Sequence, residues 1–393
     1  MNTRAIRYSL IGSLGVALAL ASGCALATSF RLTDLGTVGG TGSRGSAINA
    51  SGEVTGFFET IDGLTHAFVW DGTTTQDLGT LGGSSSEGRA INASGQVTGF
   101  AATAGDEASH AFLWDGTTMQ DLGTLGGSFS AGVDINDSGQ VAGLSDTIDG
   151  DLHAFLWDGT TMQDLGTLGG SFSESVAINT SGQVTGRASP AGDEGFHAFL
   201  WDGTTMQDLG TLGGLNGIGN AINSSGQVTG SASTAPGDDV FHAFLWDGTT
   251  VQDLNALIDP ADPLQPFVTL VGGVDINDLG QILANGFDSR TGEGHAYLVS
   301  PVPLTVPDLR AQLEALVEVV LSLNLKAGIG NALDSKLQNA LATLDRVHQQ
   351  DNGSPVGLLY AFIQSVEAQR GKALTTEQAD QLVSAAQGVI DAL

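Results

Sequence analysis

Cysteine and lysine are the scarcest chemical resources in this chain. Among its 393 residues there is one cysteine, Cys24, and no lysine stands between residues 28 and 300. A single cysteine excludes an internal disulfide framework. The sequence also lacks GxSxG, HExxH and a phosphate-binding loop. None of the common catalytic motifs is therefore available, and the sequence predicts a protein that is not an enzyme.

Positive charge is scarce as well. Residues 28–300 contain 33 Asp plus Glu against 5 Arg, a net charge of −28, and residues 301–393 add −4. A surface this negative repels phosphate backbones, so the sequence predicts no nucleic-acid partner. The charge favours cations or basic surfaces. The alternative is that it only keeps an exported protein soluble.

The first 27 residues have the three parts of a secretory signal. Arg4 and Arg7 precede an apolar run, which ends in small residues. "ALA" at residues 25–27 predicts cleavage before Thr28, whereas "ASGC" at residues 21–24 resembles a lipobox and would leave a lipid anchor on Cys24. We favour the first, since an alanine rather than a leucine stands three residues before Cys24. Either reading predicts an exported protein, secreted or at the cell surface, with no transmembrane segment after cleavage.

Glycine, by contrast, is abundant, and it occurs at fixed places in a repeat. "HAFLWDGTTMQDLGTLGG" at residues 110–127 recurs from His153 and His197 and, with changes, from His66 and His242. A sixth, divergent copy begins at His295. An "IN" element followed by a turn recurs with the same period. A period in the forties is typical of propeller blades and of some helical repeats.

Local sequence within a copy favours strands over helices. No window of ten residues shows helical spacing, and glycine interrupts each one. In the copy from Gly83, "GRAIN", "QVTGFA", "HAFLW" and "TMQDLG" read as four short strands, with "TLGGS" as the exit loop. Six units of four antiparallel strands predict a mainly β protein, a six-bladed β-propeller over residues 28–300.

The two ends of the array complement each other. The last copy stops after "HAYLVSPVP" without a fourth strand, whereas "FRLTDLG" at residues 30–36 is a fourth strand with nothing before it. Pairing the two would close the ring and remove the exposed edges of an open array. We therefore expect the amino-terminal strand to complete the last blade.

These repeats resemble the HAF family of extracellular repeats. The resemblance rests on "HAFLW", "DLGTLGG" and "INxSGQVxG" and covers about residues 30–300, with "HAY" in place of "HAF" in the last copy. It implies an exported protein and brings no established activity.

The chemistry-bearing residues of the repeat are expected to be structural. The motif histidines should form hydrogen bonds in or between blades, and the five tryptophans should pack between blades. The asparagines of the "IN" element should build turns. Two of these turns, "DINDSG" and "DINDLG", gather oxygen ligands of the kind that Ca²⁺ prefers. The candidate calcium residues are Asp134, Asn136, Asp137, Asp275, Asn277 and Asp278.

Loops between the second and third strands should share one face of the propeller. They are long and acidic, whereas the other face has tight "SG" and "DG" turns. Loops on a rigid scaffold are where binding usually occurs. The predicted binding residues are Asp106, Glu107, Asp146, Asp149, Asp151, Asp193, Glu194, Asp238 and Asp239.

After a predicted linker at residues 301–307, helix formers replace glycine. Apolar stripes predict four helices and a small bundle at residues 308–393, with Ser354 as one N-cap and Thr375 with Gln378 as a capping box. Residues 361–387 resemble the FIMAH domain, which implies an accessory or interaction module. The whole chain is expected to be a monomer that binds an unidentified extracellular protein or glycan. The alternative is a secreted glycoside hydrolase, or another polysaccharide-acting enzyme, that uses two carboxylates.

Overall fold

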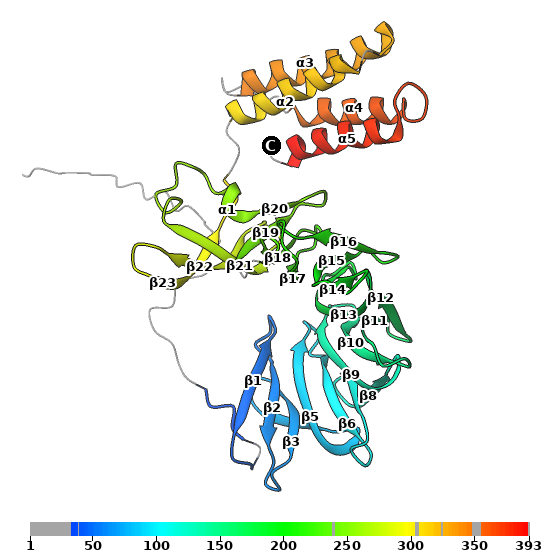
Figure 1. The fold of residues 1–393 in the computed structure, drawn as a ribbon, viewed down its shortest axis with the longest axis vertical. Coiled ribbons are helices and arrows are strands. Elements are labelled where there is room, and N and C mark those ends of the chain that lie inside the picture. Colours follow the sequence, from blue (N-terminus) through cyan, green and yellow to red (C-terminus); the bar gives the residue numbers. More distant parts are fainter. Residues whose placement is uncertain are drawn as a thin grey trace, which may run out of the picture. The chain divides into compact units, whose positions relative to one another are not determined.

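The computed structural model describes residues 33–37, 39–237, 240–302, 306–323, 325–347 and 355–391. The chain is mainly β, built of repeated strand units of about 43 residues, and ends in a helical region (Figure 1). It divides into two compact units within the fourth repeat, one of residues 1–195 and 200–207 and one of residues 196–199 and 208–393. Each unit is described by itself.

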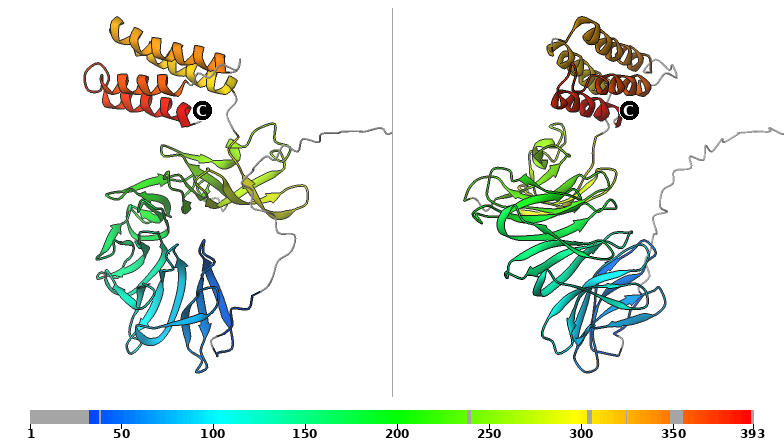
Figure 2. Two further views of the ribbon diagram at one scale, coloured as in Figure 1. Left: turned by 180° about the vertical axis from the view of Figure 1, so that it is seen from behind. Right: turned by 90° about the vertical axis from the view of Figure 1, so that its right-hand side faces the viewer.

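The first repeats have the four-strand order that the sequence predicts. In the second repeat, β5 pairs with β6, β6 with β7 and β7 with β8, all antiparallel. Neighbouring repeats lie as adjacent twisted sheets (Figure 2). The strands of the first two repeats are β1 (Ser43–Ile48), β2 (Val54–Glu59), β3 (Thr65–Trp70), β4 (Thr75–Gly79), β5 (Gly82–Ile91), β6 (Val97–Thr103), β7 (Ser109–Trp114) and β8 (Met119–Gly123). Those of the next two are β9 (Gly126–Ile135), β10 (Val141–Thr147), β11 (Leu152–Trp157), β12 (Met162–Gly166), β13 (Gly169–Ile178), β14 (Val184–Pro190), β15 (His197–Trp201) and β16 (Met206–Gly210).

The predicted exit loop is partly strand, which corrects the sequence-based expectation. β5 begins at Gly82, so "GRAIN" is only its second half. The first half runs parallel to β3 of the preceding repeat, with Ser85 beside Thr65. The Oγ of Ser86 accepts the Ala67 N–H at 2.8 Å and donates to the Gly79 carbonyl at 2.5 Å. This buried serine joins each repeat to the next, because Ser130 and Ser173 make the same two bonds.

Tryptophan packing between repeats is confirmed. Trp114 of the second repeat is buried in one cluster with Ala67, Val69 and Leu78 of the first. Trp157 is buried in the same way against the second repeat. One blade cannot cover its own apolar faces, so this contact is what makes the repeats mutually dependent.

The second unit contains a four-stranded sheet of β17 (Gly217–Ile222), β18 (Val228–Ser233), β19 (Phe241–Trp246) and β20 (Val251–Asp253). A short helix, α1 (Leu254–Leu257), follows it. The last sheet has three strands, β21 (Val268–Ile276), β22 (Ile282–Asp288) and β23 (Glu293–Val299).

The predicted closing strand lies mostly outside the described residues. Phe30, Arg31 and Leu32 are not described, and Thr33–Thr37 form no ladder. In the part of the chain that is described, β23 pairs with β22 alone. A fourth strand needs a hydrogen-bonded neighbour to be one, so closure of the ring stays a prediction.

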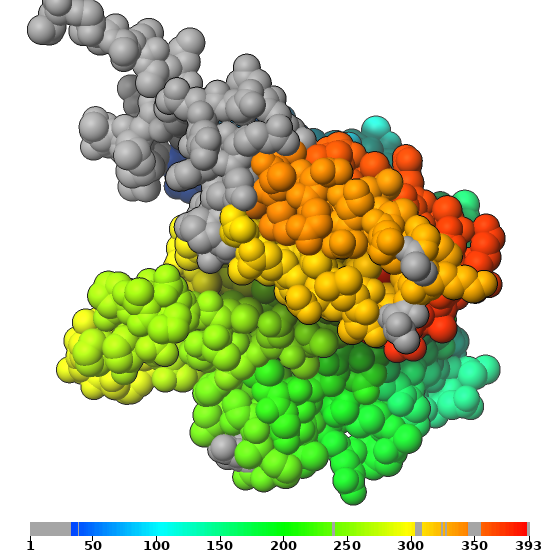
Figure 3. Space-filling model, turned by 90° about the horizontal axis from the view of Figure 1, so that it is seen from above, coloured from blue at the N-terminus to red at the C-terminus, as the bar shows by residue number. Residues whose placement is uncertain are grey.

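The predicted four-helix bundle is confirmed as α2 (Val306–Ser322), α3 (Ala327–Val347), α4 (Val356–Glu367) and α5 (Thr376–Asp391). Its core consists of residues from this helical region alone, among them Leu313, Leu337 and Phe362. The closely packed outer surface of α2 and α3 is seen in Figure 3. The helix α2 begins inside the predicted linker.

The caps of the bundle helices follow the sequence in part. Thr375 and Gln378 form the predicted capping box, with bonds of 3.0 and 3.1 Å between each side chain and the other residue's N–H. The predicted N-cap Ser354 is not among the described residues, and α4 begins after Pro355 without a side-chain cap. In the described helices, none has the length and apolarity to span a membrane.

Candidate binding face

The loops between second and third strands of the first unit were predicted to carry a binding face. They span residues 60–64, 104–108, 148–151 and 191–196. Because the same turn of each repeat follows the same strand, these loops emerge at equivalent ends of their sheets. Their acidic residues fall into two groups, those bonded into the scaffold and those that are free.

Asp106 and Asp193 belong to the scaffold. Both have positive φ angles, 58° and 54°, in loop tips where only Asn, Asp and Gly are common. Their Oδ1 atoms accept the N–H groups of Ser84 at 2.6 Å and of Ser171 at 2.8 Å. The bond from Ser171 is the main cause that lowers the pKa of Asp193. These carboxylates therefore fold the loop back onto its own repeat.

The second glycine of "GG" is explained by the same contact. A Cβ on Gly83 would lie 2.5 Å from the Asp106 carboxylate, and a Cβ on Gly170 would lie 2.3 Å from that of Asp193. In the third repeat a Cβ on Gly127 would meet the Cβ of Asp146 at 2.4 Å. The repeated pairing of "GG" with "AGDE" was a sequence signal for this role, because a left-handed tip suits Asp after Gly.

The remaining acids of the first unit are free. The carboxylates of Glu107, Asp149, Asp151 and Glu194 are exposed and make no hydrogen bond or ion pair with the described residues. Asp238 and Asp239, which were also predicted to bind, lie outside the described residues. The structure thus reduces the predicted binding set to four free carboxylates.

Two isoleucines on these loops were not predicted to matter. Ile61 is 84% exposed and Ile148 is 81% exposed, each before an Asp-Gly pair at a loop tip. Large aliphatic side chains that exposed on a rigid loop suit contact with a partner better than solvent. The sequence signal was the shared "TIDG" of the first and third repeats.

The candidate calcium residues are used to join repeats. Asp134 accepts the Ile178 N–H at 3.0 Å, and Asp137 accepts that of Ala93 at 3.0 Å. Asp278 accepts the Ser224 N–H at 2.9 Å, the main cause that lowers its pKa. Asp275 accepts the N–H of the adjacent Ile276. Within the described ranges, no three His, Cys, Asp or Glu side chains gather closely enough to hold a metal ion.

The turn asparagines are structural, as predicted. Asn92 Oδ1 accepts the N–H groups of Ser94 and Gln96. Its Nδ2 donates to the backbone carbonyl of Asn136 in the next repeat at 3.0 Å, and Asn136 does the same toward Asn179. Asn277, in the last repeat, donates to Gln281. These bonds form a ladder that runs from repeat to repeat.

The motif histidines make the predicted structural bonds inside their own repeats. Nδ1 of His110 lies 2.9 and 3.0 Å from the two carboxylate oxygens of Asp121, the aspartate of "DL" on the fourth strand. The equivalent pairs are His66–Asp77, His153–Asp164, His197–Asp208 and His242–Asp253. His295 has no fourth strand beside it, and its Nε2 lies 3.8 Å from Glu293.

The aspartates of "WDGTT" cap tight turns. In the third repeat, Asp158 accepts the backbone N–H groups of Thr160 and Thr161 at 2.8 Å and the Thr160 hydroxyl at 2.7 Å. These bonds, the Thr161 N–H first, lower the pKa of Asp158 to about 2, and the same arrangement lowers that of Asp202 to about 2. These carboxylates stabilise hairpins and are not available as acids or bases near neutral pH.

No family model and no curated protein sequence matches the chain. Among solved structures it is similar to TolB from Acinetobacter baumannii, with 11% identity and a TM-score of 0.36 over 66% of this chain and 54% of that one. It is also similar to a putative TolB from Agrobacterium tumefaciens, with 14% identity and a TM-score of 0.31 over 65% and 73% of the chains. A Mycobacterium tuberculosis puromycin-hydrolyzing peptidase shares 12% identity and a TM-score of 0.35 over 66% and 45%.

The chain spans about half the length of the first of these proteins. The similarity is a distant structural one to TolB-like β-propeller proteins, and it identifies no family.

Proposed function

We propose that this chain is an exported, non-enzymatic binding protein. Its repeats form a six-bladed β-propeller closed by the amino-terminal strand, and the loops after the second strands form the binding face. The repeats are of the HAF type, and the helical bundle is a FIMAH-like second attachment module. The amino-terminal signal directs export, with cleavage before Thr28.

The observation that carries this proposal is the division of labour among the acids. Asp106, Asp193 and the "WDGTT" aspartates have backbone and hydroxyl donors, which accounts for their presence in the fold. Glu107, Glu194, Asp149 and Asp151 have no such partners among the described residues. Four unpartnered carboxylates on loops of one scaffold, together with Ile61 and Ile148, suit a partner that is basic and partly apolar.

Catalysis has less support. A hydrolase of the carboxylate type needs two acids that face one substrate bond. The free acids belong to separate repeats or to one exposed turn, and each lies in water. A spread of charges over loop tips suits binding.

The test is a binding screen with the mature chain from Thr28. The chain is passed over glycan, cell-wall and protein arrays with and without Ca²⁺, while release of reducing ends is measured. We expect saturable binding without turnover. In the E107Q/E194Q/D149N/D151N variant, we expect affinity to fall by about tenfold or more, since exposed charges contribute up to about 1 kcal/mol each.

The matched control compares pairs of the same substitution. E107Q/E194Q removes two charges from the loops, and E318Q/E377Q removes two exposed charges from the bundle. We expect only the first pair to weaken binding. Equal losses from both pairs would show a non-specific charge effect, and turnover abolished by one acid substitution would replace the proposal with the hydrolase alternative.

A further inference from the structure

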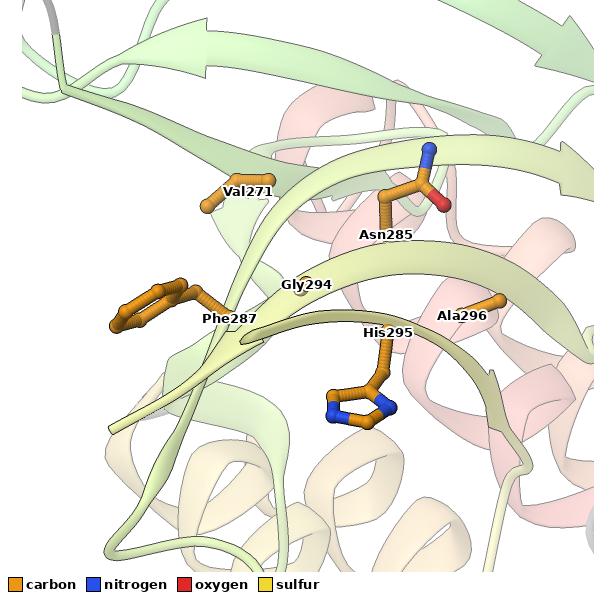
Figure 4. A pocket seen from close by; sticks show the side chains of 7 residues that line it. Val271, Asn285, Phe287, Gly294, His295 and Ala296 are labelled. Carbon is orange, nitrogen blue, oxygen red and sulfur yellow. The ribbon is translucent and has the colours of Figure 1, made fainter. Parts of the chain in front are cut away.

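The last sheet has an open pocket that no residue of its own repeat fills. It has a volume of about 590 Å³ and is lined by Val271, Asn285, Phe287, Gly294, His295 and Ala296 on β21–β23 (Figure 4). The neighbouring Leu298 on β23 is 67% exposed, whereas its equivalents Leu113 and Leu156 are 7% and 6% exposed. This face of the sheet is built like an internal one.

In the internal repeats, the same place is occupied by the start of the next repeat. Ser85 lies beside Thr65 of β3 in a parallel pair, and Phe129 lies beside Ser109 of β7. The serine that follows each of them by one residue accepts an alanine N–H of the third strand. In the last repeat the corresponding alanine is Ala296, which lines the pocket.

The amino-terminal segment already has the other half of this joint. Ser43 Oγ donates to the Gly36 carbonyl at 2.7 Å, as Ser86 Oγ does to Gly79. The Gly36 N–H donates to Asp34 at 3.0 Å, as the Gly79 N–H does to Asp77 at 2.8 Å. Residues 34–43 thus have the local bonds of residues 77–86 without a preceding third strand.

The placement of this segment on the first repeat agrees with the same role. The Thr75 hydroxyl of β4 donates to the Leu35 carbonyl. In the next joint the equivalent leucine, Leu78, contributes to a cluster that includes Met119, the residue equivalent to Thr75. The segment therefore lies against β4 as the fourth strand of a preceding repeat does.

We propose that residues 33–49 are the occupant of the pocket on the last sheet, a contact that rests on the proposed six-bladed ring. Gly42 lies beside Gly294 in a parallel pair, and Ser43 Oγ accepts the Ala296 N–H. Asp34 faces Nδ1 of His295, which gains the aspartate that the other five motif histidines have.

Two further positions fit the same register. Asn277 Nδ2 extends the asparagine ladder to the carbonyl of Asn49. Leu283 of β22 is 42% exposed and takes the position of Thr55 and Thr98, each of which fills the space over a glycine of the next repeat. The glycine for Leu283 is Gly45, over which no side chain of a preceding repeat stands among the described residues.

A cysteine pair tests the contact directly. The mature chain from Thr28 has no cysteine, so G42C/G294C introduces the only two. A Cβ at Gly42 meets nothing within 4 Å, and one at Gly294 meets only the Gly286 carbonyl at 3.8 Å, so both positions accept the change. Adjacent parallel strands lie about 4.8 Å apart, within reach of a disulfide. The matched control is T65C/S85C, the equivalent pair in an internal joint.

Under mild oxidation we expect both variants to form an intramolecular disulfide to the same extent, independent of protein concentration. A disulfide-linked dimer of G42C/G294C would show that a second copy occupies the pocket and would overturn the proposal. Absence of any disulfide, while the control forms its own, would overturn it as well. Neither result bears on the loop acids, so a failed binding screen stays distinguishable.

A double-mutant cycle gives a second measurement that needs no cysteine. Asp34→Ala and His295→Ala are combined, and the shift in urea midpoint is compared with that for Asp121→Ala and His110→Ala. We expect coupled shifts of similar size in both cycles. Additive effects at residues 34 and 295, with coupling at 110 and 121, would contradict the contact.

Discussion

Single atoms decide how one repeat fits the next. A Cβ on Gly132 would lie 2.0 Å from the hydroxyl oxygen of Thr98, which is fully buried and bonded to the Phe112 carbonyl. The pairs Thr55–Gly88 and Thr229–Gly273 have the same geometry. At the next joint the residue types are exchanged: Ala142 stands at the threonine position and Ser175 at the glycine position. Total volume is kept, but the buried Ser175 hydroxyl has no partner.

This exchange predicts a compensating pair of substitutions. Gly132→Ser alone should destabilise the chain by about 1–3 kcal/mol, because its Cβ overlaps Thr98. Adding Thr98→Ala should recover part of that loss by copying the Ala142–Ser175 arrangement. Urea unfolding of the two single variants and the double variant measures the coupling. Additive losses would show that the two residues do not share one space.

The capping aspartates predict how the fold responds to acid. The pKa of Asp158 and of Asp202 is about 2 in the folded chain against the ordinary 3.8. A lowered folded pKa contributes stability that is fully present above about pH 4 and is lost as the pH falls toward 2. The urea midpoint should therefore fall over this range.

Substituting these caps should flatten the response. D158N/D202N should show a smaller loss of urea midpoint between pH 4 and pH 2 than the parent chain. The control is D149N/D151N, which alters exposed aspartates without partners among the described residues. An unchanged slope in D158N/D202N would mean that these turns do not contribute to acid sensitivity.

At the scale of strands and helices, local signals predicted most elements. "HAFLW", the "DG" turn and the Thr375–Gln378 capping box act on neighbours in sequence, and each forms as expected. The strand character of Gly82–Ser86 was missed because its partner is β3 of the previous repeat, and two glycines hide it. The same non-local cause hid the role of Asp106, whose bond to Ser84 spans 22 residues. Free carboxylates could not be separated from bonded ones without that geometry.

The serine that bridges repeats should matter more than its exposure in sequence suggests. Ser130→Ala removes the acceptor of the buried Ala111 N–H, together with a donor to Gly123. Leaving a buried backbone N–H without a partner costs about 1–3 kcal/mol. Ser138→Ala, in an exposed turn, should cost within about 0.5 kcal/mol. Equal urea midpoints for the two variants would contradict the bridging role.

At the scale of the whole molecule, repetition is scaffolding. Each repeat covers its neighbour with a tryptophan, joins it with a serine and extends an asparagine ladder into it. Such a design places chemistry in the loops, where the repeats differ, and leaves the shared motif for packing. The end repeats are the exception, since β1 and β23 each present a face made for a neighbour. Ile48 of β1 is 69% exposed, whereas Ile135 and Ile178 are 7% and 8% exposed.

Hydrogen exchange along β23 is the measurement that tests the closed, repeat-built propeller most directly. Peptides that cover β23 (Glu293–Val299) are compared with peptides that cover β11 (Leu152–Trp157), an equivalent third strand inside the array. In a closed ring both have neighbours on each side, so the account predicts protection within about tenfold of each other. Exchange of β23 at the rate of a free sheet edge, more than about a hundredfold faster than β11, would contradict closure.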